Sequence, residues 1–531
     1  MKSSATRSRR AKAVGVATAT IAALALAPAG AAIAAPGANG CENRNNNTIA
    51  SLLACVDADG AREHLEAFQR IADENGGNRA AGLEGYEASV EYVKSTLEAA
   101  GWNVTIEEFD YNFIGPSTLQ QLTPVPGDYP TGAFSGSGAG DVTGNVIPVD
   151  INLDGDRASD SGCEATDFDG IDWSGDTDIA LIQRGTCNFG EKAYWAEQAG
   201  AEAVIIFNQG NTPDREALIV ADASSRNDGS TVQHGIPVVG ASFQQGQDLA
   251  AEGATARVFV PEPDPRPQKN VIAELPGKND DNVVMAGAHL DSVQDGPGIN
   301  DNGSGSASLL EIAQNLSKLK PQNTIRLAWW GAEEDGLLGS AAYVNGLSQA
   351  EKDRIALYLN FDMVASPNYI FMVYDGDESS FEAPVVVPEG SVQIEDLFES
   401  YFTSVGQPYD DAEFSGRSDY EAFILNDIPA GGLFTGAEVP KTQEQQAIWG
   451  GIAGESYDQC YHSACDTIDN INMEALDVNI DAIALAVLAY SYSTESVNGV
   501  PGKNIPGGLK LPAPAGPELT VGSDGGHTHD S

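Results

Sequence analysis

The chain has 531 residues and carries 77 acidic against 28 basic side chains, which gives a formal net charge of −49. Nucleic-acid binding relies on clustered Lys and Arg side chains, so this charge argues against a nucleic-acid partner, and it also disfavours binding to an anionic membrane surface. The hydrophobic content of 42% is enough for a sizeable core, and the length exceeds that of one ordinary domain.

Residues 1–35 have the pattern of a secretory signal. A basic start between Lys2 and Lys12 is followed by an Ala-rich apolar run and by a small-residue cleavage motif at 32–34. No other run approaches the roughly 20 apolar residues that span a bilayer. We therefore expect a secreted, extracellular protein without a membrane segment. Residues 36–54 are rich in Asn and Gly, and we expect a pro-segment or a flexible arm there.

The six cysteines fit an oxidising compartment. Six cysteines allow 15 pairings, and no Cys-x-x-Cys motif supports the alternative of cysteine ligands for zinc. The last two cysteines bracket His462, so a disulfide between them would close a small ring around that residue. Sequence order favours the pairs Cys41–Cys55, Cys163–Cys187 and Cys460–Cys465.

Two amphipathic helices and a strand precede a long insertion. Apolar residues recur at helical spacing over 57–74 and 84–99, and 104–109 is typical of a strand. Within the insertion, apolar strands and short helices alternate from residue 178 onward. The Pro-rich run over 261–267 predicts a stiff linker at its end.

An apolar run over 283–288 ends in His289, and a Gly-rich loop with Asp301 follows. Open α/β folds hold their ligands at the carboxyl ends of strands, so this strand would deliver His289 to such an edge. Apolar residues at helical spacing from Leu309 to Leu316 place Asp301 in the loop before a helix. His289 and Asp301 are candidate ligands of one metal centre, although a His and an Asp beside loops are also common as polar caps.

Three further segments carry the same kinds of side chain. The next apolar strand is followed by Glu333 and Glu334, and two adjacent acids point in different directions, so that one can bind a metal while the other moves a proton. The strand after it ends at Asp362, and a later loop carries His462. The chain contains six histidines, and two of them, His289 and His462, fall in these four segments, which favours a metal centre over ordinary surface groups.

These segments resemble the secreted two-zinc aminopeptidases of the bacterial leucyl aminopeptidase type, which are related to vacuolar aminopeptidase Y. The resemblance extends over residues 55–110 and 270–496. It implies a three-layer α/β/α zinc aminopeptidase domain with a mixed sheet, an α/β fold, which we place at residues 55–115 and 268–496.

The resemblance also implies the role of each candidate. Glu333 would be the general base, beside two zinc ions that share a bridging hydroxide. Three ligand carboxylates and two neutral imidazoles leave one positive charge on the two zinc ions, and that hydroxide neutralises it. One zinc would be bound by His289 and Asp362, the other by Glu334 and His462, and both by Asp301.

The insertion resembles the protease-associated domain, a small β-rich module, at residues 183–187 and 200–208. We place this domain at residues 130–262. It contains no cluster of acids and histidines, so we expect no chemistry in it. Two roles remain open: it covers the mouth of the active site and restricts substrate size, or it is a passive addition.

Segments after Asp362 match parts of the same family that line the substrate pocket. The resemblance implies that Met363 and Phe434 form an apolar wall with Tyr461, although both residues are equally compatible with a core position. The hydroxyl of Tyr461 would hydrogen-bond the oxyanion that forms during attack. Arg417 would present its backbone to the substrate amine.

A last helix over about 473–494 has an apolar stripe that would pack on the sheet. Its Asp477 and Asp481 lie one turn apart and match acids that bind calcium in a relative, with Asp57 as the nearest partner, while paired surface acids are the commoner explanation. Residues 497–531 are rich in Gly and Pro, and we expect a disordered or removed tail there.

The function that follows is a monomeric, secreted metallo-aminopeptidase. It would hydrolyse the N-terminal residue of peptides that have a free N-terminus, with a preference for large apolar residues such as Leu. A carboxypeptidase or dipeptidase on the same scaffold is the first alternative. A non-catalytic binding protein of receptor type is the second; it predicts broken metal ligands, whereas all five ligands and the general base are present.

Overall fold

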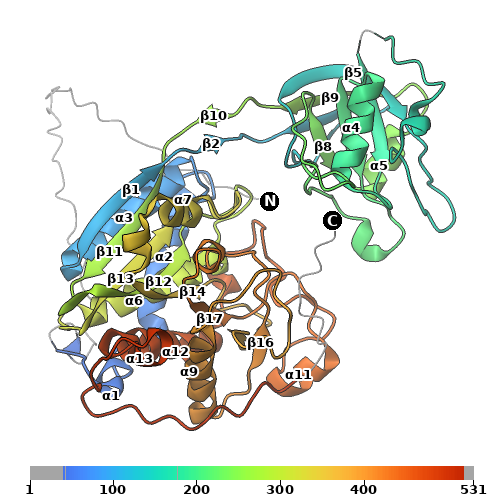
Figure 1. Cartoon of the computed structure of the whole chain (residues 1–531). Helices are drawn as coiled ribbons and strands as arrows, with labels where there is room; N and C mark the ends of the chain where they lie inside the picture. The colour runs from blue at the N-terminus through green and yellow to red at the C-terminus, as the bar shows by residue number, and fades with distance from the viewer. Residues whose placement is uncertain (1–39, 42–43, 176, 520–531) are drawn as a thin grey trace, which may run out of the picture. The chain divides into compact units, whose positions relative to one another are not determined.

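The computed structural model describes residues 40–41, 44–175 and 177–519 (Figure 1). The expected signal segment, 1–35, and the last residues of the expected tail, 520–531, lie outside the described residues. Among the helices of the described residues, none combines the length and the apolar composition of a membrane span. Three disulfides are present, in the pairs that sequence order favours: Cys41–Cys55, Cys163–Cys187 and Cys460–Cys465.

The larger domain is built on an eight-stranded mixed sheet (Figure 1). Its central strands run parallel, whereas the strands toward one edge pair antiparallel. At the other edge β15 is antiparallel to β17 and parallel to β16. In sheet order the strands are β1 (Asn103–Phe109), β11 (Gln268–Leu275), β13 (Asn323–Trp330), β12 (Asn279–His289), β14 (Ile355–Phe361), β17 (Ala430–Phe434), β15 (Met372–Tyr374) and β16 (Asp410–Ala412).

Helices cover both faces of this sheet, which gives the expected three layers. Along β12, Val284 and Ala286 belong to the core on one face, while the intervening Met285 belongs to a second core on the other. The first core contains side chains of α2 (Ala58–Glu74), α3 (Glu84–Ala100), α6 (Ser304–Leu316), α9 (Ser391–Val405) and α12 (Met473–Tyr492). The second contains side chains of α7 (Leu338–Gly346) and α10 (Glu421–Ile424).

The inserted domain has its own seven-stranded sheet, between residues 118 and 260. Its α4 (Phe189–Ala199) and α5 (Phe243–Leu249) pack on opposite faces, because alternate residues of the central strands join two separate cores. The strands, in sheet order, are β4 (Gly127–Tyr129), β3 (Thr118–Thr123), β9 (Thr255–Val260), β5 (Gly140–Pro148), β6 (Asp178–Gln183), β7 (Ala203–Phe207) and β8 (Val238–Ala241).

Short elements complete the described chain. The segments that enter and leave the insertion pair as a two-stranded ribbon, β2 (Asn112–Phe113) and β10 (Asp264–Pro265). The remaining α-helices are α1 (Ile49–Leu52), α8 (Gln349–Lys352), α11 (Gln443–Trp449) and α13 (Glu495–Asn498).

The C-terminal segment differs from the expected disordered tail over residues 499–519. It forms no helix or strand, but Leu509 and Leu511 pack against the first core and Ile505 is buried. The backbone N–H of Glu518 donates to the carbonyl of Tyr409 (2.9 Å). Widely spaced apolar side chains therefore hold a segment whose overall Gly and Pro content suggested disorder.

Candidate metal centre

Three neighbouring parallel strands deliver the candidate ligands to one edge of the sheet. His289 is the last residue of β12, Glu333 and Glu334 follow β13, and Asp362 follows β14. Because β12 lies between the other two strands, the carboxyl ends of all three are adjacent. Asp301 joins them from the loop before α6.

Asp301 lies between the two histidines that the sequence analysis singled out. Its Oδ1 is 3.2 Å from His289 Nε2, and its Oδ2 is 3.3 Å from His462 Nε2. His462 belongs to the loop that the Cys460–Cys465 disulfide closes. The two oxygens of one carboxylate thus face two different imidazoles, which is the arrangement a bridging ligand requires.

Each histidine also faces a second carboxylate. His289 Nε2 is 3.4 Å from Asp362 Oδ1, and His462 Nε2 is 2.9 Å from Glu334 Oε2. Glu333 Oε2 is 3.8 Å from His289 Nε2. The structure therefore brings together all six residues that the sequence analysis placed at this centre.

Two buried oxygens in the centre, Glu334 Oε1 and Asp362 Oδ1, have no hydrogen-bond partner among the residues that the structure describes. A buried carboxylate oxygen without a donor is costly, because it has lost its water and gained nothing in return. Imidazole nitrogens and carboxylate oxygens are the donors that zinc takes in catalytic sites. The orphaned oxygens and this donor set fit a bound divalent cation.

Burial and close charges strongly perturb the titration of the centre. Burial raises the pKa of Glu333 well above its usual value, and burial together with the Asp301 charge raises the pKa of Glu334 to about 7. Burial lowers the pKa of His462, but Glu334 and Asp301 outweigh it and bring that pKa to about 11. The carboxylates repel one another, and bound protons or a cation must compensate their charge at neutral pH.

Two residues that the sequence analysis did not assign hold this arrangement. Asp291 accepts the backbone N–H groups of Glu333 (3.2 Å) and Glu334 (3.3 Å) on its two carboxylate oxygens. The Asp291 carbonyl accepts from His289 Nδ1 (3.2 Å), which leaves Nε2 directed at the centre. Ser418 donates to Asp362 Oδ2 (2.6 Å). The position of Asp291, two residues after a candidate ligand, is a signal that sequence reasoning could have used.

Residues 270–487 match peptidase family M28, and residues 142–249 match the PA domain. The chain is 46% identical over 461 residues to an aminopeptidase of Pseudomonas aeruginosa, covering 85% of this chain and 84% of the relative. It is 40% identical to leucine aminopeptidase 2 of Trichophyton equinum, over 81% of this chain and 83% of the relative.

The chain belongs to peptidase family M28. It is a hydrolase of the metallo-exopeptidase class and carries a PA domain as its insertion. Among solved structures, it is similar to a zinc aminopeptidase from Bacillus subtilis, with 26% identity and a TM-score of 0.63, over 81% of this chain and 95% of that one.

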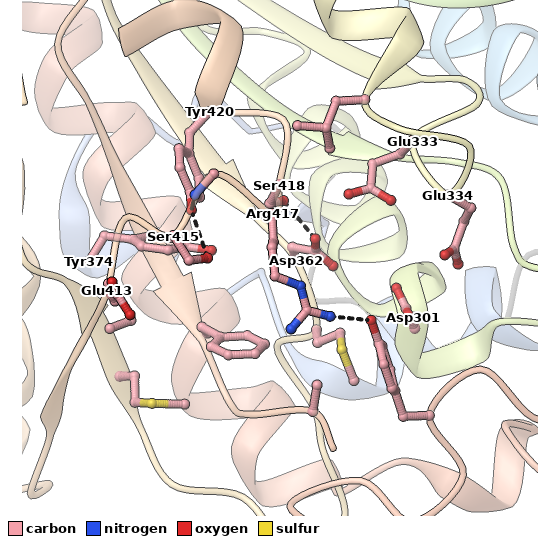
Figure 2. A pocket seen from close by; sticks show the side chains of 18 of the residues that line it. Asp301, Glu333, Glu334, Asp362, Tyr374, Glu413, Ser415, Arg417, Ser418 and Tyr420 are labelled. Atoms are coloured by element: carbon pink, nitrogen blue, oxygen red, sulfur yellow. Dashed lines mark hydrogen bonds between the residues drawn. The ribbon is translucent and has the colours of Figure 1, made fainter. Parts of the chain in front are cut away.

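A cavity of about 310 Å³ opens beside the metal centre of the M28 domain (Figure 2). Its lining includes Asp301, Glu333, Glu334 and Asp362 together with apolar side chains. The four residues that the sequence analysis assigned to substrate contact or oxyanion binding all line it: Met363, Arg417, Phe434 and Tyr461. It is also lined by residues that the sequence analysis had not assigned: Met372, Tyr374, Ala412 and Glu413.

Tyr461 stacks on His462, with ring centroids 3.8 Å apart. Its hydroxyl accepts a hydrogen bond from Arg417 (3.2 Å). Burial and the nearby acids raise the pKa of Tyr461 well above its usual value, so the hydroxyl keeps its proton at neutral pH. The phenol is thus a hydrogen-bond donor at the edge of the M28 centre.

The candidate calcium ligands lie away from this cavity, on α12. Asp477 accepts the backbone N–H of Ala58 (3.2 Å), which brings it beside Asp57. Burial and the charges of Asp477 and Asp57 raise the pKa of Asp481 to about 7. The three acids therefore approach one another, and calcium binding by them stays a prediction.

Proposed function

We propose that this M28 peptidase is a secreted two-zinc aminopeptidase that removes large apolar residues, such as Leu, from the N-termini of peptides. The observation that carries the proposal is the position of Asp301, whose two carboxylate oxygens face His289 and His462 separately. Asp362 and Glu334 complete one imidazole–carboxylate set on each side. Relatives that match most of this chain are named aminopeptidase and leucine aminopeptidase 2.

In this proposal His289 and Asp362 hold one zinc, Glu334 and His462 hold the second, and Asp301 touches both. Two zinc ions at such a centre supply Lewis acidity, which activates a water molecule and polarises the scissile carbonyl. The charge balance supports two ions, because three ligand carboxylates and two neutral imidazoles need more positive charge than one divalent cation brings.

Glu333 is the proton carrier in this proposal. It lines the cavity, and it lies next to Glu334 in the chain without sharing that residue's contact with His462. Asp291 fixes the backbone that precedes its side chain. Glu333 would accept a proton from the attacking water and then deliver it to the departing amine.

Tyr461 and the apolar wall would position the substrate. The protonated phenol of Tyr461 would donate a hydrogen bond to the oxyanion, with Arg417 holding it in place. Met363 and Phe434 line the cavity, where they would contact the first side chain of the peptide. A volume of about 310 Å³ lies at the small end of the range for ligand pockets, which favours entry of one end of a peptide.

The proposed secretion rests on the disulfides. All six cysteines are paired, and disulfides persist in oxidising compartments outside the cytosol. The proposal is tested by comparing cells that produce the full-length protein with cells that produce a variant lacking residues 1–35. The protein should be found in the medium only in the first case.

The deciding experiment compares two substrates. Leu-p-nitroanilide has a free amine, and N-acetyl-Leu-p-nitroanilide has a blocked one. We expect hydrolysis of the first compound alone, loss of activity on dialysis against a zinc chelator, and recovery after two equivalents of zinc. Cleavage of the blocked compound alone would point to another hydrolase on this scaffold. A folded protein that binds no zinc would leave only a binding role.

A further inference from the structure

A second group of carboxylates lies apart from the metal centre, where α9 packs behind the edge strands β15 and β16. Three buried acids, Glu395, Glu399 and Asp411, each place one oxygen within 4.8 Å of the others. Glu395 also belongs to an adjoining group of the same size with Asp375 and Asp377. Glu395 and Glu399 are one turn apart on α9, so they present their charges on the same side of the helix.

Asp411 is buried and has an oxygen that is not used in a hydrogen bond within the described residues. It is 5% exposed, and its buried Oδ1 has no hydrogen-bond partner in the described ranges, while Oδ2 accepts a hydrogen bond from the hydroxyl of Ser380. Glu395 uses Oε2 for the backbone N–H groups of Gly376 (3.1 Å) and Asp377 (3.0 Å). Asp411 Oδ1 and Glu395 Oε1 accept none of these hydrogen bonds, and each of the two acids places one oxygen in the group.

No basic side chain among the described residues forms an ion pair with the five acids of these two adjoining groups. Burial and the neighbouring carboxylates raise the pKa of Glu395 to about 9 and that of Glu399 to about 7. Asp410 interacts electrostatically with Asp411, and Glu518 interacts with Asp410. The group must bind either protons or a cation near neutral pH.

We propose that Glu395, Glu399 and Asp411 bind a divalent cation with a preference for oxygen ligands, and that this cation is calcium. The donors are all carboxylate oxygens, without an imidazole or a thiolate that would favour zinc. Calcium accepts six to eight oxygen ligands in flexible geometry, and water and the adjoining Asp375 group can supply the remaining ones. This site is distinct from the zinc centre and from the acids on α12.

The cation would support the wall of the substrate cavity from behind. Met372 and Tyr374 of β15 and Ala412 of β16 line the cavity. Val373, between the first two, instead joins the core that contains α9, and its partner in β16 is Asp411. Because strand residues alternate between faces, an ion that ties α9 to Asp411 holds the back of the strands whose front faces the substrate.

Calcium binding to the full-length, zinc-loaded protein tests this site. The protein is dialysed against calcium-free buffer that contains zinc, and calcium and magnesium are then titrated separately by calorimetry. We expect calcium to bind and to raise Tm by a few degrees at saturation. Glu399→Gln and Asp411→Asn should each bind one calcium fewer or weaken that binding at least about tenfold. Asp477→Asn is the matched control, and it should still bind calcium at the site formed by Glu395, Glu399 and Asp411.

Three outcomes would overturn the proposal. They are absence of calcium binding to the wild-type protein, calcium binding to both variants with wild-type stoichiometry and affinity, and a loss confined to Asp477→Asn. Zinc content and circular dichroism show whether each variant is folded. If Asp411→Asn does not fold, the calcium-binding test uses Glu399→Gln alone. As a second readout, we expect calcium to lower KM for Leu-p-nitroanilide in the wild-type protein and to have no such effect in Glu399→Gln.

Discussion

Arg79 offers a sharp test of how the loop between His289 and Asp301 is held. Its side chain is fully buried and donates hydrogen bonds to three backbone carbonyls of that loop: Leu290, Pro297 (2.9 Å) and Gly298 (2.5 Å). Its guanidinium also lies 5.0 Å from the ring centre of Phe68. Burial lowers the pKa of Arg79 to about 10, so it stays charged at neutral pH.

Arg79→Met keeps much of the apolar stem and removes all three donors. Each buried carbonyl left without a partner costs about 1–3 kcal/mol, so the loss of three donors should lower the unfolding free energy by at least about 3 kcal/mol. Because the loop connects two proposed zinc ligands, the variant should also bind zinc more weakly. Urea unfolding of the zinc-loaded protein measures the first effect, and competition with a chromogenic zinc chelator measures the second.

Arg62→Met is the matched control on the surface of α2. Arg62 forms an exposed i,i+4 pair with Glu66 (3.3 Å), and its loss should cost about 0.5 kcal/mol or less. If Arg79→Met unfolded at the same urea concentration as Arg62→Met and kept wild-type zinc affinity, the hydrogen bonds of Arg79 would not be what holds the loop.

Three further predictions follow from individual contacts. Glu333→Gln should keep its zinc and lower kcat about 10²–10⁴-fold, and a wild-type kcat in a steady-state assay would exclude Glu333 as the proton carrier. Changing both Cys460 and Cys465 to Ser should cost about 2 kcal/mol and speed zinc loss on dialysis, since His462 lies in the loop that the disulfide closes; unchanged zinc retention would contradict this. Burial lowers the pKa of His64 from 6.5 to about 4, so the unfolded chain takes up a proton first as the pH falls. Neutral His64 therefore contributes up to about 3 kcal/mol to the unfolding free energy above pH 6.5, and this contribution is lost as the pH falls to about 4. In His64→Gln, the unfolding free energy measured in urea should depend less on pH over that range.

The sequence was sufficient to predict that the candidate ligands lie at the carboxyl ends of buried strands. Each candidate ligand follows an apolar run, and a buried parallel strand is such a run with its polar residues at the carboxyl end. This local pattern located His289, Glu333 and Asp362 without knowledge of strand order. The order β13-β12-β14 then brings the three ends together.

The residues that sequence reasoning missed act through contacts between distant segments. Arg79 contacts a loop more than 200 positions away in the chain, and nothing in its local sequence indicates burial. Ser418 lies 56 positions from the Asp362 carboxylate to which it donates. The local sequence of Asp411 is that of a surface acid, but β16 pairs with β15 and Asp411 lies beside Glu395 and Glu399 of α9. Periodicity reports which face of an element is apolar, but it does not report which polar residues of other elements meet there.

Two groups of buried acids, one at the metal centre and one beside α9, relate the strongly acidic composition to the fold. A net charge of −49 opposes compaction through self-repulsion, and burying acids in groups makes the folded state still more dependent on bound positive charge. Ions that bind the folded arrangement, and not the same acids dispersed along an unfolded chain, contribute their binding free energy to folding. If the proposed zinc and calcium sites are filled, cations therefore hold the cavity from two sides: zinc at the strand ends that face the substrate, and calcium behind the edge strands that form its wall. Stability and substrate binding would then both depend on the divalent cations in the surroundings.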